Sequence, residues 1–206
     1  QLFASARSSG IQYRFVKCTF LQPECGLLGF ICGESGRRVD PAKVEQLRQW
    51  PEYTSCADVV SHTAFCQYLR EYFGPEFPTK VKPLRPYSKK DYDFAKYATD
   101  VPAQEARKWL ISTLIEKVIL VEPDWKAAAK PWESGRPFET FYDAADEQWA
   151  VALTQRDYPG GTPRLIAMRA HTLDEAATRW SAFEREFFGI RSGHDAIAKW
   201  ITGFKE

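Results

Sequence analysis

Several residue types that define common classes of site are scarce in this 206-residue chain. It has three histidines, and none of its five cysteines forms a C-x-x-C pair; they are Cys18, Cys25, Cys32, Cys56 and Cys66. A zinc site is therefore not expected. An odd cysteine count without the spacing of a small disulfide scaffold predicts reduced thiols in an intracellular compartment. No run of about 18 apolar residues occurs, so we expect neither a membrane span nor a membrane partner.

The chain also lacks an excess of either charge. Its 28 basic and 27 acidic residues leave a formal net charge of +1, so a nucleic-acid partner would have to be held by local basic patches. At 206 residues the chain can hold one large domain or two small ones, and its hydrophobic content of 44% is ordinary for a folded protein. The 7 Trp, 9 Tyr and 14 Phe favour a well-packed core over exposed stacking platforms.

The first half of the chain predicts short strands followed by helices. Alternation and glycine spacing over residues 11–39 predict two or three strands, with turns near 23–26 and 33–36. Asp40-Pro41 predicts the start of a helix that ends at Pro51. A second helix is predicted over about 55–73. Residues 75–103, rich in Pro, Lys and Tyr, are expected to form an extended connection with little core of its own.

The second half predicts a helix and then a strand-rich segment. The helix is expected over about 102–117, followed by a short strand at 118–121 and a loop over 122–137. Strands are expected at 138–142, 149–154 and 165–168. Residues 174–189 and 194–204 have helical spacing and form either two helices or one helix broken near Gly193.

Three blocks of short motifs carry a resemblance to a known family. The first comprises Lys17-Cys18-x-Phe20-Leu21, Leu28-Gly29-Phe30, Gly36, Asp40-Pro41-x-Lys43-Val44, Trp50-Pro51, residues 65–73 and Pro83-Leu84. The second comprises residues 104–114, Val118-Ile119-Leu120 and Pro123-Asp124. The third comprises residues 141–145, 150–155, Ile166-Ala167, Thr172-Leu173, Trp180-Ser181 and 184–190. In order and spacing they resemble KCxFL, YLGH, G, DPxKV, WP, YYRRF, PL, PVL, PD, TDAS, GAVLSQ, PIAYASRTL and YSxxEKELLAI of gypsy-type LTR retrotransposon reverse transcriptases.

The resemblance implies an α+β fold. Reverse-transcriptase thumb and connection helices with a short β-hairpin would be followed by an incomplete ribonuclease H-like α/β domain. By this resemblance residues 1–39 form the end of the palm and a primer-grip-like hairpin. Residues 40–121 form a thumb and connection-like region, and residues 122–206 a truncated ribonuclease H-like domain.

The chemistry of the family needs clustered carboxylates. Polymerisation uses acids that hold two Mg²⁺ ions about 3.5–4 Å apart, and the family's Tyr-x-Asp-Asp motif does not occur in these 206 residues. Ribonuclease H activity needs four carboxylates around two such ions. The resemblance places Asp143 at the first position and Glu186 at the second, while the third and fourth have no match. Gln148 and Trp149 also replace the small residues of the family pattern. We therefore expect Asp143 and Glu186 to be vestigial, with no active catalytic residue, no metal and no cofactor.

Nucleic-acid binding would rest on basic residues in two segments, because Lys and Arg contact phosphates. The first set is Arg37, Arg38, Lys43 and Arg48, and the second is Lys80, Lys82, Arg85, Lys89 and Lys90. The second set is interleaved with Tyr and Pro, which suits structured RNA. An ordinary solvated loop is an equally good interpretation. Lys126, Lys130 and Arg136 form a weaker third set.

Two functions from different classes fit these observations. The first is a non-catalytic, retroelement-derived RNA-binding or structural subunit of a larger ribonucleoprotein assembly, for which an organellar ribosome is one concrete setting. Neighbouring chains or RNA would then cover the open edge of the ribonuclease H-like sheet. The alternative is a fragment of an active reverse transcriptase–ribonuclease H polyprotein, with Mg²⁺ and the missing carboxylates supplied from outside these residues. A protein-only scaffold is a third, weaker class.

The first 23 residues bear on localisation. They contain basic and hydroxylated residues and no acid before Glu24, a weak similarity to an organellar transit peptide. A processed chain of another origin explains the same pattern equally well. The expected location is intracellular, with a mitochondrial or other organellar matrix as one option.

Overall fold

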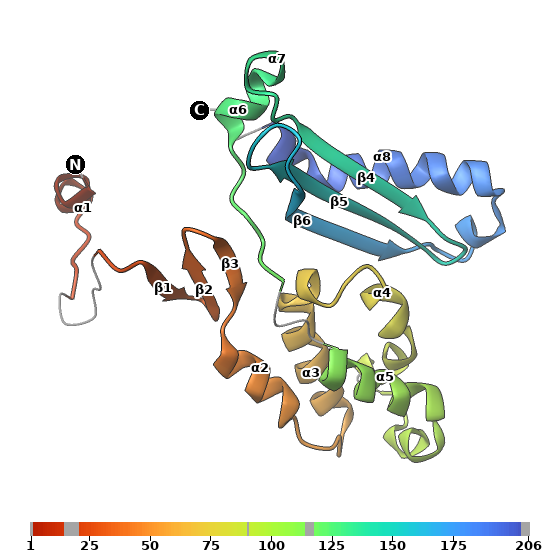
Figure 1. The fold of residues 1–206 in the computed structure, drawn as a ribbon. Helices are drawn as coiled ribbons and strands as arrows, with labels where there is room; N and C mark the ends of the chain where they lie inside the picture. Colours follow the sequence, from red (N-terminus) through yellow and green to blue (C-terminus); the bar gives the residue numbers. More distant parts are fainter. Residues whose placement is uncertain (1, 15–20, 90, 114–117, 203–206) are drawn as a thin grey trace.

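The computed structural model describes residues 2–14, 21–89, 91–113 and 118–202. The first part of the chain contains α1 (Leu2–Ser8), a three-stranded sheet and a group of helices (Figure 1). The second part contains another three-stranded sheet and one long helix. The architecture is therefore α+β, as the sequence predicted.

The first sheet is an antiparallel meander of β1 (Glu24–Leu27), β2 (Phe30–Gly33) and β3 (Gly36–Val39). The turn between β1 and β2 is formed by Leu28 and Gly29, which both have positive φ. Two such residues in succession are typical of the type I′ turn whose twist matches a hairpin. The turn predicted at 33–36 is confirmed. The turn predicted at 23–26 is wrong, because the chain reverses at Leu28-Gly29 and Glu24–Leu27 is a strand.

Two capped helices follow the first sheet. In α2 (Pro41–Arg48) the side chain of Asp40 accepts a hydrogen bond from the backbone N–H of Ala42, so the predicted N-cap is confirmed. Helix α3 (Cys56–Tyr68) begins with a capping box between Ser55 and Asp58. It ends before residue 73, and the predicted helical segment continues as the short 3₁₀ helix η2 (Arg70–Tyr72).

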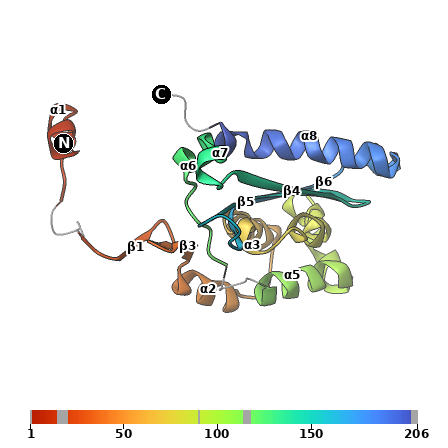
Figure 2. The ribbon, with the colours of Figure 1, turned by 45° about the horizontal axis from the view of Figure 1, so that its top comes forward.

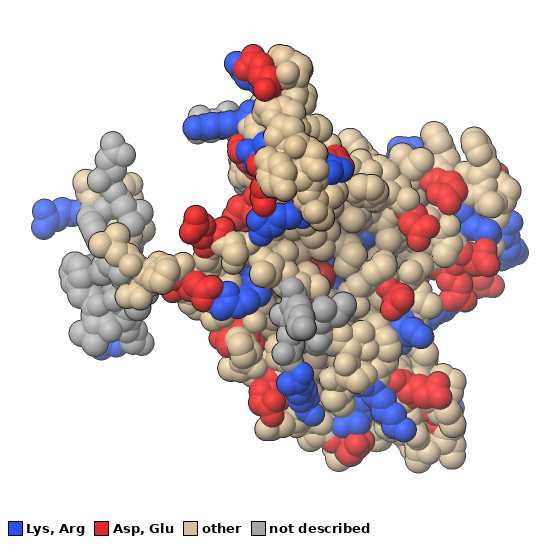
Figure 3. Space-filling view, viewed as in Figure 1, with Lys and Arg blue, Asp and Glu red and all other residues tan. Residues whose placement is uncertain are grey.

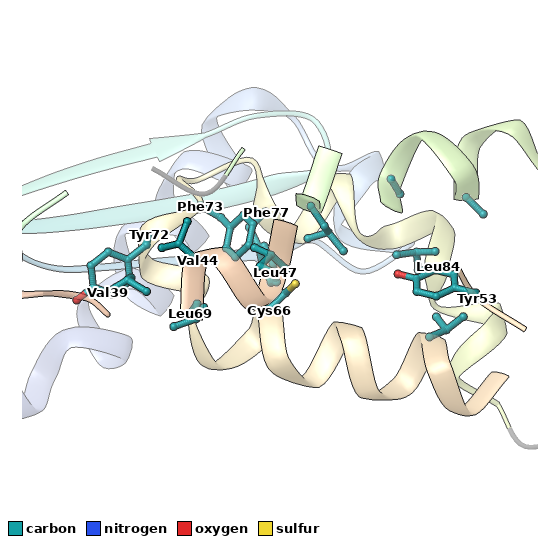
Figure 4. Packing of buried hydrophobic residues seen from close by; sticks show 14 of the residues in the cluster. Val39, Val44, Leu47, Tyr53, Cys66, Leu69, Tyr72, Phe73, Phe77 and Leu84 are labelled. Atoms are coloured by element: carbon teal, nitrogen blue, oxygen red, sulfur yellow. The ribbon is translucent and has the colours of Figure 1, made fainter. Parts of the chain in front are cut away.

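Residues 75–103 fold against these helices, which contradicts the predicted extended connection. They form α4 (Phe77–Lys80), η3 (Lys82–Leu84), η4 (Pro86–Ser88), η5 (Phe94–Thr99) and the start of α5 (Val101–Thr113). Leu84 and Tyr87 are completely buried. Proline sets φ for the short 3₁₀ turns, and the aromatic and leucine side chains between the prolines fill the core. Figure 4 shows Leu84 and Tyr53 in the same apolar cluster as Leu47 and Cys66.

The segment that links the two halves differs from its prediction. Residues 118–121 are not a strand: Leu120 makes a single β-bridge to Arg37, and Val121 donates to the carbonyl of Leu165. The predicted loop contains two short helices, α6 (Trp125–Ala129) and α7 (Pro131–Ser134). Leu114 and Ile115, which were assigned to the preceding helix, lie outside the described residues.

The second sheet has the strand order β4-β5-β6, with β4 (Phe138–Ala144), β5 (Gln148–Arg156) and β6 (Pro163–Thr172). All three strands were predicted, although each is longer than expected. After η6 (Ala177–Arg179), helix α8 (Ala182–Ile201) crosses one face of this sheet. Figure 2 shows the sheet between α8 on one side and the helices of the first half on the other.

Helix α8 is continuous through Gly193, so the predicted break is wrong. A Cβ atom at Gly193 would lie 3.0 Å from Cδ1 of Tyr142 and 3.0 Å from Cβ of Val151. At Gly189 it would lie 3.3 Å from the Cβ atoms of Ala144 and Trp149. The two glycines therefore let the helix approach the sheet closely and do not interrupt it.

Candidate functional site

The two carboxylates predicted from the resemblance lie at one end of the second sheet. Asp143 is the sixth residue of β4, and Glu186 lies in the second turn of α8; both are exposed. Because Tyr142 and Ala144 contact α8, strand alternation directs Asp143 toward the opposite face of the sheet. The structure thus brings both residues to the same region but does not point Asp143 at the helix that carries Glu186.

Glu186 lies beyond the end of β4. Helix α8 runs antiparallel to this strand, since Gly189 packs on Ala144 and Gly193 on Tyr142. Glu186 precedes Gly189 by three residues, which is about 4.5 Å further along the helix axis. At that level the turn between β4 and β5 is bound by Arg185, whose guanidinium donates to Asp146 at 2.7 Å. Among the described residues, no group of three or more His, Cys, Asp or Glu side chains is arranged to hold a metal ion.

The acids around Glu186 have structural partners. Glu184 accepts hydrogen bonds from the backbone and hydroxyl of Ser181 in a capping box, and these bonds lower the pKa of Glu184. Arg185 binds Asp146 rather than its neighbours in the helix.

Gln148 and Trp149, which depart from the family pattern, are packing residues. The hydroxyl of Thr79 in α4 donates to Oε1 of Gln148 at 2.5 Å. Trp149 is 6% exposed and stacks on His171 at a ring-centroid distance of 5.5 Å. Both side chains fill space between elements, so they close the region where a smaller residue would leave room.

In the first predicted basic set, Arg37 and Arg38 are bound to carboxylates. Arg38 forms two hydrogen bonds to Glu24, at 2.6 and 2.8 Å, and they lower the pKa of Glu24. Arg37 binds Glu71 at 3.1 Å and lies over the ring of Phe30. Lys43 donates to the neutral amide of Gln46 and lies over the ring of Phe65, and no ion pair to an acid in the described residues is found for it. Arg48 ends α2 and lines a shallow pocket together with Arg38.

The second basic set joins the two halves of the chain. Lys82 forms an ion pair with Glu147 at 3.3 Å, and Arg85 donates to the hydroxyl of Thr172 at 3.0 Å. Lys80 and Lys89 are exposed and have no acidic partner in the described part of the chain. Lys90 lies outside the described residues, as do Lys17, Cys18 and Phe20 of the first motif. In the weaker third set, Lys130 pairs with Glu133 and Arg136 with Asp124.

Sequence reasoning missed a charged junction between the halves. Glu71 in η2 binds Arg37 of β3 and Arg169 of β6, and the side chains of Glu71 and Arg169 are each 13% exposed. Burial, with the charges of Arg70 and Arg37, lowers the pKa of Arg169 to about 10. The three residues are separated by up to 132 positions in sequence, and no motif connects them. Only the fold brings them together.

The surface charges are distributed rather than concentrated. On the face shown in Figure 3, basic and acidic side chains alternate over both halves. This agrees with the pairing of Arg37, Arg38 and Lys82 with acids.

In the described part of the chain, no helix has both the length and the apolar character needed to cross a membrane.

Comparison with known proteins identifies related sequences. Residues 133–206 match the model of the RNase H-like domain found in reverse transcriptase. The retrovirus-related Pol polyprotein from transposon opus of Drosophila melanogaster is 23% identical over 98% of this chain. The corresponding protein from transposon gypsy is 25% identical over 92% of the chain. The chain spans only 20% and 18% of these two proteins.

Solved structures show the same fold. The foamy viral protease-reverse transcriptase in complex with an RNA/DNA hybrid has a TM-score of 0.68 and 16% identity, over 91% of this chain and 24% of that protein. A second structure of that viral protein, in complex with double-stranded DNA, has a TM-score of 0.70 over 98% of this chain and 32% of the other. At this identity the likeness concerns the fold alone.

Proposed function

Because this chain is a distant homologue of the reverse-transcriptase connection and ribonuclease H-like region of gypsy-type retrotransposon Pol polyproteins, we propose that it is a non-catalytic, nucleic-acid-holding segment of such a polyprotein. It would hold an RNA-containing duplex along its helical half and supply the first strands and helix of a ribonuclease H-like domain. Residues 1–39, 40–121 and 122–206 would act as hairpin, thumb with connection, and ribonuclease H-like part.

The fold likeness over nearly the whole chain carries this proposal. It includes both halves at once, so the helical half and the second sheet have a relative placement like that of a reverse transcriptase solved with an RNA/DNA hybrid. Lys43, Lys80 and Lys89 support it, since they are cations without an acidic partner in the described residues. Such lysines are available for phosphate contacts, whereas a cation already bound to a carboxylate must first give up that partner.

The proposal that the chain is non-catalytic rests on where its carboxylates point and on how few of them lie together. Asp143 is directed away from α8, and the described residues do not supply a ligand set for a metal ion. Two Mg²⁺ ions need several oxygen ligands from acids in one place. In the alternative, an active ribonuclease H, further carboxylates would have to come from residues beyond those present here.

An open strand edge supports placing the chain in a larger polypeptide. Strand β4 is a terminal strand and pairs only with β5 within the described residues. The outward face of α8 carries Phe183 and Phe187, which are 80% and 65% exposed. We propose that a further strand and an apolar surface of the polyprotein cover this edge and this face. The comparisons give no support for a ribosomal or mitochondrial setting, and we do not propose one.

The salt dependence of binding tests the nucleic-acid role. The chain should bind an RNA/DNA hybrid with an affinity that falls as salt rises, and replacing Lys80 and Lys89 by Ala should reduce the log–log slope by about two, or one per phosphate contact. Lys82→Ala should change the slope less, since Lys82 is paired with Glu147. Lys130→Ala, in an exposed pair with Glu133, is the matched control. An unchanged slope for the double variant would contradict the assignment.

A nuclease assay separates the proposal from the enzymatic alternative. With Mg²⁺ the chain should leave an RNA/DNA hybrid intact, and Asp143→Asn should alter the free energy of unfolding by no more than about 0.5 kcal/mol, as expected for an exposed residue. Cleavage that is abolished by Asp143→Asn would show that the carboxylates do form a working site.

A further inference from the structure

The first sheet places two cysteines directly opposite each other. Cys25 of β1 and Cys32 of β2 are register partners in the antiparallel ladder. Opposed residues in such a ladder point to the same face of the sheet. Both thiols are free, Cys25 is exposed, and Cys32 is partly buried against the core of the helical half.

The spacing of the ladder suits a covalent link between these residues. Opposed residues in an antiparallel pair have Cα atoms about 4.5–5.5 Å apart, depending on whether they exchange hydrogen bonds. A disulfide requires a Cα separation of roughly 4.4–6.8 Å. The two thiols can therefore be joined without moving the backbone out of the hairpin.

No other pair of described cysteines is placed in this way. Cys56 and Cys66 lie on the same helix, α3, ten residues apart, which separates them by about 15 Å along the axis. Cys66 is completely buried. Within the described residues, the hairpin of β1 and β2 is the only ladder that sets two cysteines opposite each other.

We propose that Cys25 and Cys32 form a dithiol site that undergoes reversible thiol–disulfide exchange with small-molecule disulfides such as oxidised glutathione. The exposed Cys25 thiolate attacks one sulfur of the small disulfide, forms a mixed disulfide and releases one small thiolate. The Cys32 thiolate then attacks the Cys25 sulfur and releases the second. Two protein thiols are oxidised and one small disulfide is reduced; the two protons lost by the protein thiols pass through solvent to the two released thiolates, which become two small thiols.

The link would secure a strand that has little else to hold it. All four residues of β1 are exposed, so no buried side chain anchors this strand. It is held by the ladder to β2 and by the ion pair of Glu24 with Arg38 of β3. Figure 1 shows β1 at the outer edge of this sheet, with α2 and α3 on the side of β3. Oxidation would therefore fix β1 to β2 covalently, whereas the reduced strand is held by the ladder and this ion pair.

Digestion after glutamate provides a direct assay of the full chain. Glu24 and Glu34 flank the two residues, so the peptide 25–34 contains Cys25 and Cys32 and no other cysteine. The full chain is first equilibrated with reduced and oxidised glutathione and then digested. The mass of this peptide should then be two hydrogen atoms lower than the mass of the reduced peptide, and its cysteines should resist alkylation. The same ratio of glutathiones applied in concentrated urea should give an equilibrium constant for the disulfide at least about tenfold lower, because the ladder no longer holds the thiols together.

A register-shifted variant is the matched control. Moving the second cysteine by one position, with Cys32→Ser and Ile31→Cys together, places the two thiols on opposite faces of the hairpin. This variant should acquire mixed disulfides with glutathione and no internal link. The proposal is overturned if the wild-type peptide 25–34 carries two glutathiones, stays open to alkylation at both residues under excess oxidised glutathione, or links no better than the shifted variant.

Discussion

Replacement of Glu71 by Gln should destabilise the whole chain, because this one carboxylate balances two arginines from different sheets. Arg37 reaches it from β3 and Arg169 from β6. The substitution keeps the shape of the side chain and removes its charge. Arg169 would then remain largely buried without an acid and in the field of Arg70, whose charge already lowers the pKa of Arg169.

The magnitude follows from the exposure of the three side chains. Breaking a buried ion pair by removing one partner costs about 3–5 kcal/mol. The side chains of Glu71 and Arg169 are both 13% exposed. We therefore expect the cost of breaking this ion pair to lie at the lower end of that range, at about 3 kcal/mol. Arg37 is 35% exposed and adds no more than about 1 kcal/mol, since water screens it.

Urea unfolding followed by tryptophan fluorescence measures this cost. Glu133→Gln, which breaks the exposed pair with Lys130, should cost less than about 0.5 kcal/mol and is the control. The double variant Glu71→Gln and Arg169→Gln should be more stable than the sum of the single changes by at least about 1 kcal/mol, because no unpaired buried charge remains. A cost below about 1 kcal/mol for Glu71→Gln, or strict additivity in the double variant, would refute the reasoning.

Two further predictions concern buried positions. Gly193→Ala should lower the free energy of unfolding by about 1 kcal/mol despite its better helix propensity, since the added Cβ meets Tyr142 and Val151 at 3.0 Å. Gly189→Ala, with 3.3 Å contacts, should cost less, and equal stability of both variants would argue against close packing. Burial, assisted by Arg107, lowers the pKa of His62 to about 4, so the folded state keeps this imidazole neutral while the unfolded state binds a proton below about pH 6.5. Stability should therefore fall by up to about 3 kcal/mol as the pH drops from about 6.5 to 4; if His62→Gln loses stability just as steeply over this range, His62 is not the cause.

The elements that sequence alone predicted correctly are those with local signals. Asp40 and Pro41 mark the start of α2 because an N-cap and a proline at the first position act within one turn. The strands predicted at 138–142 and 149–154 are confirmed as parts of β4 and β5; β5 has a buried face, and β4 is partly buried. The sequence signals that predicted these elements each lie within a few residues of each other.

The errors arose where contacts distant in sequence override local composition. The prolines and lysines of residues 75–103 suggested an extended segment, yet Tyr87 is buried and binds Asp100 at 2.7 Å. Gly193 suggested a helix break, whereas the sheet beneath it requires a residue without a side chain. A single sequence does not reveal which surface a glycine or a tyrosine will meet, so neither outcome had a local signal.

The candidate site shows the same contrast between what local sequence predicts and what contacts distant in sequence determine. The sequence identified which residues are basic, but their partners are set by the fold: Arg37 binds Glu71, 34 positions away, and Lys82 binds Glu147, 65 positions away. The pair of Lys82 with Glu147 joins the two halves of the chain, and Glu71 joins them as well, because it also binds Arg169 of β6. The basic residues therefore separate into structural ones, whose loss should reduce stability, and available ones such as Lys80 and Lys89, whose loss should reduce phosphate binding.

The exposed surfaces of the second half bear on the proposal that the chain is a segment of a larger protein. An unpaired strand edge at β4 offers backbone N–H and C=O groups to any other strand, and natural proteins generally cover or block such edges. On α8, Phe183, Phe187 and Ile190 are exposed at helical spacing, so they form an exposed apolar stripe along the helix. Both features leave apolar area and hydrogen-bonding groups in water that a covering strand and helix would remove. A strand that paired with β4 would also lie beside Asp143, so the element that completes the sheet is the same element that would decide whether Asp143 gains further carboxylate neighbours.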